Sequence, residues 1–165
     1  MVLSNRKRIR LPETAYKNLG SVYSITIATR SRAPIFTDLP FCKSCLRILG
    51  EMSVAAEVRV FAYCMMPDHI HLLMGAPGRG SIARFVGAWK SQCYRERRRM
   101  GLDRPFWQRS FYDHILRSDE DLRRTAQYIL ENPSRAGLVK NAGEYPLSGS
   151  FELDLRTLTQ RCGRG

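Results

Sequence analysis

The stretch Val58–Met74 reads VRVFAYCMMPDHIHLLM, and its pattern decides which fold is expected for this chain of 165 residues. Val58 to Met65 is rich in apolar residues on both faces, which is typical of a buried strand. Pro67-Asp68 predicts a turn into a second strand, His69 to Met74. The sequence therefore predicts two consecutive strands at the centre of the chain.

The flanking sequence predicts five further elements. They are a strand at Val22–Thr29, a helix at Phe41–Ala56, a helix capped by Ser81 with its apolar stripe at Ile82–Cys93, a strand at Phe111–Arg117, and a helix that begins at the capping box Ser118–Asp121 and ends at Pro133. The first six elements follow the βαββαβ order of an α+β, ferredoxin-like sandwich, with an antiparallel sheet, helices on one face and an additional C-terminal helix. By analogy with that topology, the first and third strands are central, so the strand that carries the histidines lies mid-sheet.

Composition indicates one globular domain over residues 1–165 with a polyanionic partner. Hydrophobic residues make up 44%, which is enough for a core, and 27 Lys and Arg face 15 Asp and Glu, giving a net charge of +12. Residues 1–20 are interpreted as a basic arm and residues 152–165 as a mobile basic tail. On charge alone, a basic ribosomal or RNA-binding module is an equal alternative.

The same sequence indicates a cytoplasmic protein with no membrane partner. No apolar run reaches the length of a membrane span, and the basic start is not followed by the apolar stretch of a signal peptide. Five cysteines, an odd number, favour reduced thiols. Cys42 and Cys45 form an isolated CxxC, for which structural packing is a better interpretation than a metal site.

Two short patterns carry the predicted chemistry. His69 and His71 are separated by one strand residue, so both imidazoles project from one face, as metal ligands would. Asp68 would orient a histidine or only complete the turn. Tyr128 and Asn132 are four residues apart and share a helical face turned away from the apolar stripe. A phenol and an amide beside two imidazoles would supply a nucleophile and a third ligand, whereas the default roles are surface packing and a helix stop.

Several ordered blocks of the sequence resemble one known family. The segment MPDHIHLLM at residues 66–74 is similar to the histidine–hydrophobe–histidine motif of single-tyrosine HUH transposases. The blocks FWQRSFYDHI at residues 106–115, YILENP at residues 128–133 and AGLV at residues 136–139 resemble the REP-associated tyrosine transposase branch, and YPLSGS at residues 145–150 resembles its closing block with three departures. The resemblance covers roughly Tyr23 to Phe151.

The resemblance implies a specific enzyme. Tyr128 would be the nucleophile, His69 and His71 would be metal ligands with Asn132 as the third, and the metal would be Mg²⁺ or Mn²⁺. The target would be single-stranded DNA folded into imperfect hairpins, cut through a 5′-phosphotyrosine in a bacterial cytoplasm at the nucleoid. Family members act as monomers or as homodimers, and both states remain open here. Imidazole ligands favour late transition metals, whereas Mg²⁺ prefers oxygen.

Basic and aromatic residues in three regions are candidates for DNA binding. They lie in the N-terminal arm, on one flank of the second helix and in the segment that follows it: Arg6, Lys7, Arg8, Arg10, Arg84, Lys90, Arg95, Arg98, Trp107 and Arg109. A solvated charged face explains the helix flank about as well. His114 is either a further ligand or base, or a histidine beside the sheet.

Two other functions compete with the nuclease. A non-catalytic RNA- or DNA-binding module on an RRM-like sheet would explain the charge and the fold, but it would leave the histidine pair and Tyr128 without a role. A two-histidine phosphoesterase normally has a paired His-x-Ser/Thr motif. His71 and His114 are instead followed by Leu72-Leu73 and Ile115-Leu116, which disfavours that function.

Overall fold

The computed structural model describes residues 20–116 and 119–152. Its strands and α-helices are, in chain order, β1 (Val22–Ala28), α1 (Leu39–Ala55), β2 (Val60–Met66), β3 (His69–Gly75), α2 (Ile82–Arg99), β4 (Tyr112–Leu116), α3 (Asp119–Arg135) and β5 (Ser148–Gly149). Short 3-10 turns, η2 and η3, occupy Arg30–Arg32 and Ala142–Glu144. Ser118 of the predicted capping box lies outside the described residues, as do the predicted arm before Gly20 and the predicted tail after Glu152.

The strands form one antiparallel sheet in the order β4-β1-β3-β2-β5. This arrangement confirms the α+β fold predicted from the sequence, with the first and third strands in the interior and the histidine strand β3 in the middle. The two-residue strand β5, which pairs with β2, was not predicted. A strand of two residues is too short to show any periodicity, and its position depends on the packing of the chain that precedes it.

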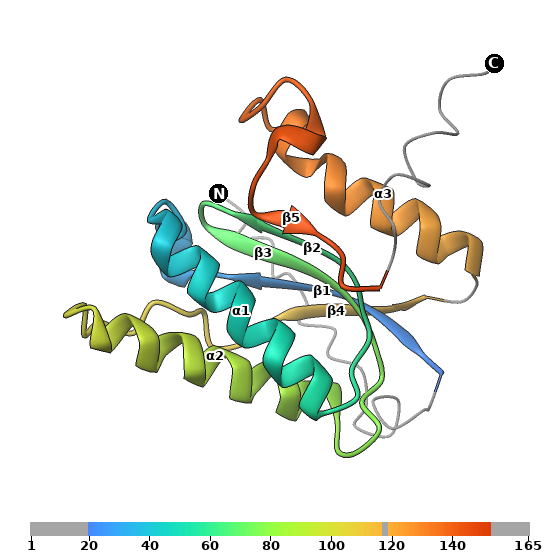
Figure 1. Ribbon diagram of the computed structural model, residues 1–165, viewed down its shortest axis with the longest axis horizontal. Coiled ribbons are helices and arrows are strands. Elements are labelled where there is room, and N and C mark those ends of the chain that lie inside the picture. The colour runs from blue at the N-terminus through green and yellow to red at the C-terminus, as the bar shows by residue number, and fades with distance from the viewer. Residues whose placement is uncertain (1–19, 117–118, 153–165) are drawn as a thin grey trace, which may run out of the picture.

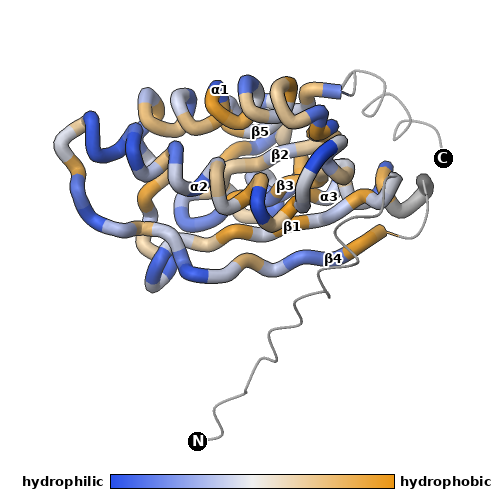
Figure 2. The backbone as a smooth tube through the Cα atoms, turned by 90° about the horizontal axis from the view of Figure 1, so that it is seen from below, coloured by the Kyte–Doolittle hydropathy of each residue, from blue (hydrophilic) through white to orange (hydrophobic). Residues whose placement is uncertain are grey.

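The three α-helices cover opposite faces of the sheet. Helices α1 and α2 lie together on one side and α3 lies on the other (Figure 1). The larger apolar cluster joins α1 and α2 to one face, which includes Ile25, Ile70 and Leu72. Along α1, apolar and polar residues alternate as expected for a helix with one buried side (Figure 2).

A smaller apolar cluster lies beneath α3. Its buried members are Phe61, Ala62, Cys64, Met66, Leu73, Ala126 and Ile129. The register of β2 against β3 shifts between Val60 and Ala62, and this irregularity allows Phe61 and its neighbour Ala62 to join the same cluster. Helix α3 is therefore fixed to the sheet face that also carries the odd-numbered side chains of β3.

The prediction that Pro133 ends the last helix was wrong. Helix α3 continues to Arg135, with Pro133 buried in its final turn. The chain leaves the helix through Gly137, which has a φ of 73°. The Gly137 N–H donates to the Ser134 carbonyl at 3.0 Å, and the Leu138 N–H donates to the Pro133 carbonyl at 2.9 Å, which together form a Schellman motif. A proline in the last turn removes only one helical hydrogen bond, so the helix can continue past it.

The cysteines confirm the structural interpretation of the CxxC pair. Cys42 and Cys45 are both fully buried in the larger cluster, and burial raises the pKa of the Cys42 thiol to about 12. A thiol with a raised pKa stays protonated at neutral pH, as expected for a side chain packed in the core. Within residues 20–116 and 119–152, no helix is both long and apolar enough to cross a lipid bilayer.

Candidate metal and nucleophile site

The histidine pair lies on the sheet face covered in part by α3. In the β-sheet register, His71 is opposite Thr26 on one side and Cys64 on the other, and His69 is opposite Ala28 and Met66. Directly paired residues of antiparallel strands project to the same face, so the two imidazoles share a surface with Cys64, Met66 and the end of β1. Both imidazoles therefore project from one face of β3, as the HxH spacing predicts.

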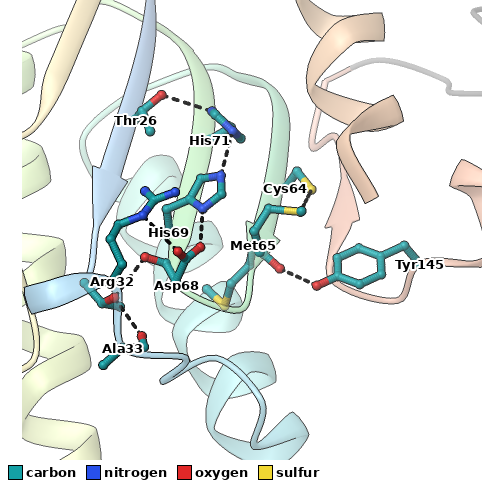
Figure 3. A network of polar contacts seen from close by, with 11 residues as sticks. Thr26, Arg32, Ala33, Cys64, Met65, Asp68, His69, His71 and Tyr145 are labelled. Atoms are coloured by element: carbon teal, nitrogen blue, oxygen red, sulfur yellow. Dashed lines mark hydrogen bonds and ion pairs between the residues drawn. The ribbon is translucent and has the colours of Figure 1, made fainter. Parts of the chain in front are cut away.

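The two Nε2 atoms point toward each other, at a distance of 3.0 Å (Figure 3). Each Nδ1 atom, on the opposite side of its ring, has a polar partner of its own. The Nδ1 of His69 lies 2.6 Å from Oδ1 of Asp68, and the Nδ1 of His71 lies 3.0 Å from Oγ1 of Thr26. Asp68 in turn forms an ion pair with Nε of Arg32 at 2.8 Å. This chain of contacts sets both ring orientations, as outer partners of metal-binding histidines do.

The partners on the Nδ1 side also determine which atoms can bind a cation. A carboxylate can only accept, so in the neutral form of the His69 ring the Asp68 contact places the proton on Nδ1 and leaves the lone pair on Nε2. The Thr26 hydroxyl can donate or accept, so it accommodates either tautomer of His71. Burial, with His69 and Arg32 nearby, lowers the pKa of His71 to about 4. His71 is therefore a neutral imidazole at neutral pH, the form that binds metals.

The nitrogen spacing fits a pair of metal ligands. Two nitrogens that are each about 2.1 Å from a common ion and subtend about 90° at it would lie about 3.0 Å apart, which is the cis arrangement of an octahedral site. The observed Nε2–Nε2 distance is 3.0 Å. No cluster of three or more His, Cys, Asp or Glu side chains that could hold a metal occurs among the described residues. Within the described residues, the remaining ligand types are therefore an amide or a carbonyl, beside water and the substrate.

Arg32 belongs to the site, and sequence analysis missed it. Ser31 and Arg32 both have positive φ, 54° and 55°, which is costly for residues with a Cβ. The buried Thr29 holds this turn in place, because its hydroxyl lies 2.7 Å from the Ala33 carbonyl and 2.9 Å from the Asp68 carbonyl. Thr29 thereby ties the turn to the residue before His69. One arginine among many carries no pattern in the sequence, so only the folded turn identifies it.

Tyr128 is exposed on α3, with 49% of its surface accessible, and the Arg135 guanidinium lies 4.7 Å from the centre of its ring. Both Tyr128 and Asn132 lie within α3, so helical geometry continues between them as expected. Asn132 donates from Nδ2 to the Tyr128 carbonyl at 3.0 Å, which leaves Oδ1 as the possible ligand atom. Within the described part of the chain, the Tyr128 hydroxyl makes no hydrogen bond with either imidazole.

The position of α3 nevertheless relates Tyr128 to the histidine pair. Its neighbour Ile129 belongs to the same buried cluster as Cys64 and Met66. These two β2 residues are the direct cross-strand partners of His71 and His69. The helix that carries the phenol thus packs beside the strand positions next to both imidazoles, on the same face of the sheet.

Other tyrosines are less suited to act as the nucleophile. The Tyr145 hydroxyl donates to the Met65 carbonyl at 2.7 Å, and burial raises its pKa to about 12. The Tyr94 hydroxyl donates to Asp103 at 2.7 Å. Tyr112 is 61% exposed and lies on the histidine face, opposite Thr26 in the register. Among the described residues, Tyr128 and Tyr112 are therefore the exposed phenols to be compared by experiment.

His114 does not join the histidine pair. It is exposed on the edge strand β4, opposite Ser24, and β1 separates it from β3. Its side chain shares the face of the pair, but strand spacing places it about 10 Å to the side. This position favours a histidine beside the sheet over a third ligand.

The basic residues predicted to bind DNA separate into groups. Lys90, Arg95, Arg98 and Trp107 line one pocket, whereas Arg84 and Arg109 are exposed and do not line it. The N-terminal candidates Arg6, Lys7, Arg8 and Arg10 lie outside the described residues.

Comparisons with known proteins place this geometry in a family. The model of the family described as "Transposase IS200 like" matches residues 19–132. A candidate REP-associated tyrosine transposase of Haemophilus influenzae is 35% identical over 106 residues, covering 58% of this chain and 60% of that protein. A REP-associated tyrosine transposase of Escherichia coli is 29% identical over 94 residues, covering 57% of this chain and 54% of that protein. The match thus spans little more than half the length of these relatives.

Solved structures share the fold. A REP-associated tyrosine transposase bound to a REP hairpin superposes with a TM-score of 0.67 at 22% identity, covering 79% of this chain and 77% of that one. A candidate transposase of Deinococcus radiodurans gives a TM-score of 0.50 at 26% identity, covering 70% of this chain and 93% of that one. These matches confirm the resemblance predicted from the sequence, and the chain belongs to the IS200-like transposase family.

Proposed function

We propose that the protein is a metal-dependent endonuclease and strand transferase that acts on single-stranded, hairpin-forming DNA through a 5′-phosphotyrosine on Tyr128. The observation that carries the proposal is the convergence of the His69 and His71 Nε2 atoms, 3.0 Å apart, on the sheet face that also holds α3. Membership of a transposase family supports the reaction class. By analogy with bacterial relatives, the enzyme would act in the cytoplasm at the nucleoid.

His69, His71 and the Oδ1 of Asn132 would hold a divalent cation, which we propose to be Mn²⁺ or Mg²⁺. When bound, such an ion polarises a non-bridging oxygen of the scissile phosphate. Arg32 supports this arrangement by holding Asp68, and its guanidinium places a second positive charge beside the imidazoles. Two nitrogen ligands with an amide oxygen and phosphate oxygens suit Mn²⁺ better than Mg²⁺, because Mg²⁺ prefers oxygen ligands.

The chemical step is an in-line displacement at phosphorus. The Tyr128 oxygen forms a bond to phosphorus while the bond to the 3′ oxygen breaks. The phenol proton passes to solvent or to a nearby base, and the departing 3′ oxygen takes up a proton from solvent. The products are a free 3′ hydroxyl and a 5′-phosphotyrosine. Attack by another 3′ hydroxyl reverses the step and joins a new strand, so transfer conserves the phosphodiester bond energy. The relative whose structure is solved was bound to a REP hairpin, which supports a hairpin substrate here.

Incubation with a labelled hairpin oligonucleotide and Mn²⁺, followed by a denaturing gel, tests the proposal. We expect a covalent protein–DNA adduct that is absent with chelator and in Tyr128→Phe. Tyr112→Phe is the matched control, because it removes another exposed phenol on the same side of the sheet and should retain the adduct. If Tyr128→Phe forms the adduct and Tyr112→Phe does not, the nucleophile is Tyr112. If the wild-type protein binds the hairpin without any adduct, non-catalytic nucleic-acid binding is the better function.

A further inference from the structure

A second concave site lies along α2. It is on the side of the sheet covered by α1 and α2, opposite the face that carries the histidine pair. It is a pocket of about 420 Å³ lined by Gly87, Lys90, Ser91, Tyr94, Arg95, Arg98 and Trp107. The volume is within the range of small-molecule sites, about 300–1,000 Å³. None of the lining side chains is acidic, and three are cationic. The pocket therefore favours an anionic ligand.

Trp107 provides a rigid aromatic surface in this pocket. Its ring packs against Phe36 and Trp89, with centroids 5.3 and 5.4 Å away, and its Nε1 donates to the Lys90 carbonyl at 3.0 Å. The indole is nonetheless only half-buried, and it lines the pocket. A ring already fixed by the protein loses little entropy when another flat group stacks on it.

The cations around the pocket differ in how they are engaged. Lys90 Nζ donates to the Gln108 carbonyl at 2.7 Å and lies 5.9 Å from the Trp107 ring centre. Arg98 forms an ion pair with Asp103 at 3.0 Å. Arg95 is exposed and lines the pocket without a carboxylate partner among the described residues. Arg95 is thus the cation best placed to meet a phosphate.

Gly87 leaves open space at one wall of the pocket. A Cβ added at this helical position would meet no atom within 4 Å, so no packing within the described chain requires glycine here. A glycine inside a helix costs about 1 kcal/mol relative to alanine. A residue that weakens the helix without any packing role is expected where another molecule approaches the backbone closely.

The pocket is connected to the end of the sheet that carries the histidines. Trp107 forms an isolated β-bridge with Thr29, and the Thr29 N–H donates to the Asp68 carbonyl at 2.9 Å. Asp68 is the residue that holds His69. A DNA strand that leaves the histidine pair could therefore pass around the end of β1 and reach the pocket.

We infer that this pocket binds one nucleotide of single-stranded DNA, with the base stacked on Trp107 and its phosphate at Arg95. An unpaired base is required, because the bases of a duplex are stacked inside and cannot enter a pocket of this kind. The inference rests on the proposed function only for the nature of the ligand, since binding in the pocket requires neither metal nor cleavage.

Binding of a fluorescent decathymidylate, measured by anisotropy without metal at several salt concentrations, tests this site. We expect Arg95→Gln to weaken binding about 3- to 10-fold and to reduce the salt slope by about 0.7, the value for one phosphate contact on a single strand. Arg99→Gln is the matched control. Arg99 is an exposed arginine of the same helix outside the pocket, and its loss lowers the net charge equally. Equal effects of the two variants would overturn the inference.

A second pair of variants tests the pocket without changing charge. Gly87→Gln places a side chain in the open space and should weaken decathymidylate binding about tenfold, because stacking of a base is worth a factor of this order. Ala88→Gln alters the exposed neighbouring position, which does not line the pocket, and should have no effect. Gly87→Gln raises the helix propensity, and glutamine is nearly as good a helix former as the alanine it replaces at position 88, so loss of folding is not expected in either variant.

Intrinsic fluorescence gives an independent measurement. The chain has two tryptophans, and Trp89 is fully buried. Quenching by decathymidylate should therefore report on Trp107, and it should be lost in Gly87→Gln and retained in Ala88→Gln. If a ten-base-pair duplex binds more tightly than decathymidylate and depends on the same residues, the pocket is a duplex contact and the inference is wrong. If the wild-type protein forms no covalent adduct but shows these effects on decathymidylate binding, only the proposed nuclease function is rejected.

Discussion

The histidine pair and Tyr128 differ in how firmly the fold holds them. Each imidazole is oriented on both nitrogens, by Asp68 or Thr26 on one side and by the other imidazole on the opposite side. Tyr128 is half-exposed, and its ring is in contact with the Arg135 guanidinium. The metal-binding half of the proposed site is thus organised before substrate arrives, whereas the phenol must still be directed to the phosphate. Substrate DNA or a second copy of the chain would provide that direction.

Mixing two inactive variants distinguishes these possibilities and should give the largest effect. His69→Ala and Tyr128→Phe should each abolish the covalent adduct while retaining hairpin binding. Because Ile129 shares a buried cluster with the strand neighbours of both histidines, we expect the histidines and Tyr128 of one chain to form one site. The mixture should therefore remain inactive on the denaturing gel.

Recovered activity would reject that arrangement. If two chains exchange helices, mixed dimers contain one complete site, and about a quarter of the wild-type sites should return. Mixing the wild-type protein with Tyr128→Phe controls for loss of activity by dilution. If His69→Ala also loses hairpin binding, the histidine strand serves the structure of the DNA-binding surface rather than the reaction.

An intermediate effect is expected at the outer partner of His71. Thr26→Val keeps the shape of the side chain but removes the hydroxyl that lies 3.0 Å from His71 Nδ1. Loss of such a partner should weaken Mn²⁺ binding about 10- to 100-fold, as measured by calorimetry or by the Mn²⁺ dependence of adduct formation. Ser24→Ala is the control, since it removes a hydroxyl from the same strand face opposite Leu73. Equal affinities of Thr26→Val and the wild type would show that the pair does not depend on this contact.

The smallest effect concerns the helix that positions the phenol. Gly137 adopts a φ of 73° at the end of α3, so Gly137→Ala should lower the free energy of unfolding by about 1 kcal/mol. Gly143→Ala, at a glycine with open space and no positive φ, should cost less. Urea denaturation measures both. If the two variants are equally stable, the Schellman motif does not contribute to the placement of α3.

Much of this fold could be predicted because its elements are long and periodic. The alternating pattern that begins at Val22 predicted strand β1, and the helical spacing that begins at Ile82 predicted helix α2. In both cases the observed element begins where the pattern begins. The end of α3 could not be predicted from Pro133, because whether a helix continues past proline depends on how its last turn packs. Strand β5 was missed because its pairing with β2 is a contact between distant segments.

The candidate site, like the fold, has features that the sequence predicts and features that only the tertiary structure shows. That His69 and His71 share a face follows from the two-residue period of any strand, and that Tyr128 and Asn132 share a face follows from the helical repeat; local covalent geometry determines both. The amino-acid sequence by itself thus determined which residues are paired. Only the tertiary structure decided what surrounds each pair. Thr26 contacts His71 from the neighbouring strand, and Arg32 holds Asp68, the partner of His69. Helix α3 lies on the histidine face because a bulged strand and a small apolar cluster hold it there. Such contacts join segments far apart in the chain, and their free energy depends on packing that no local pattern records.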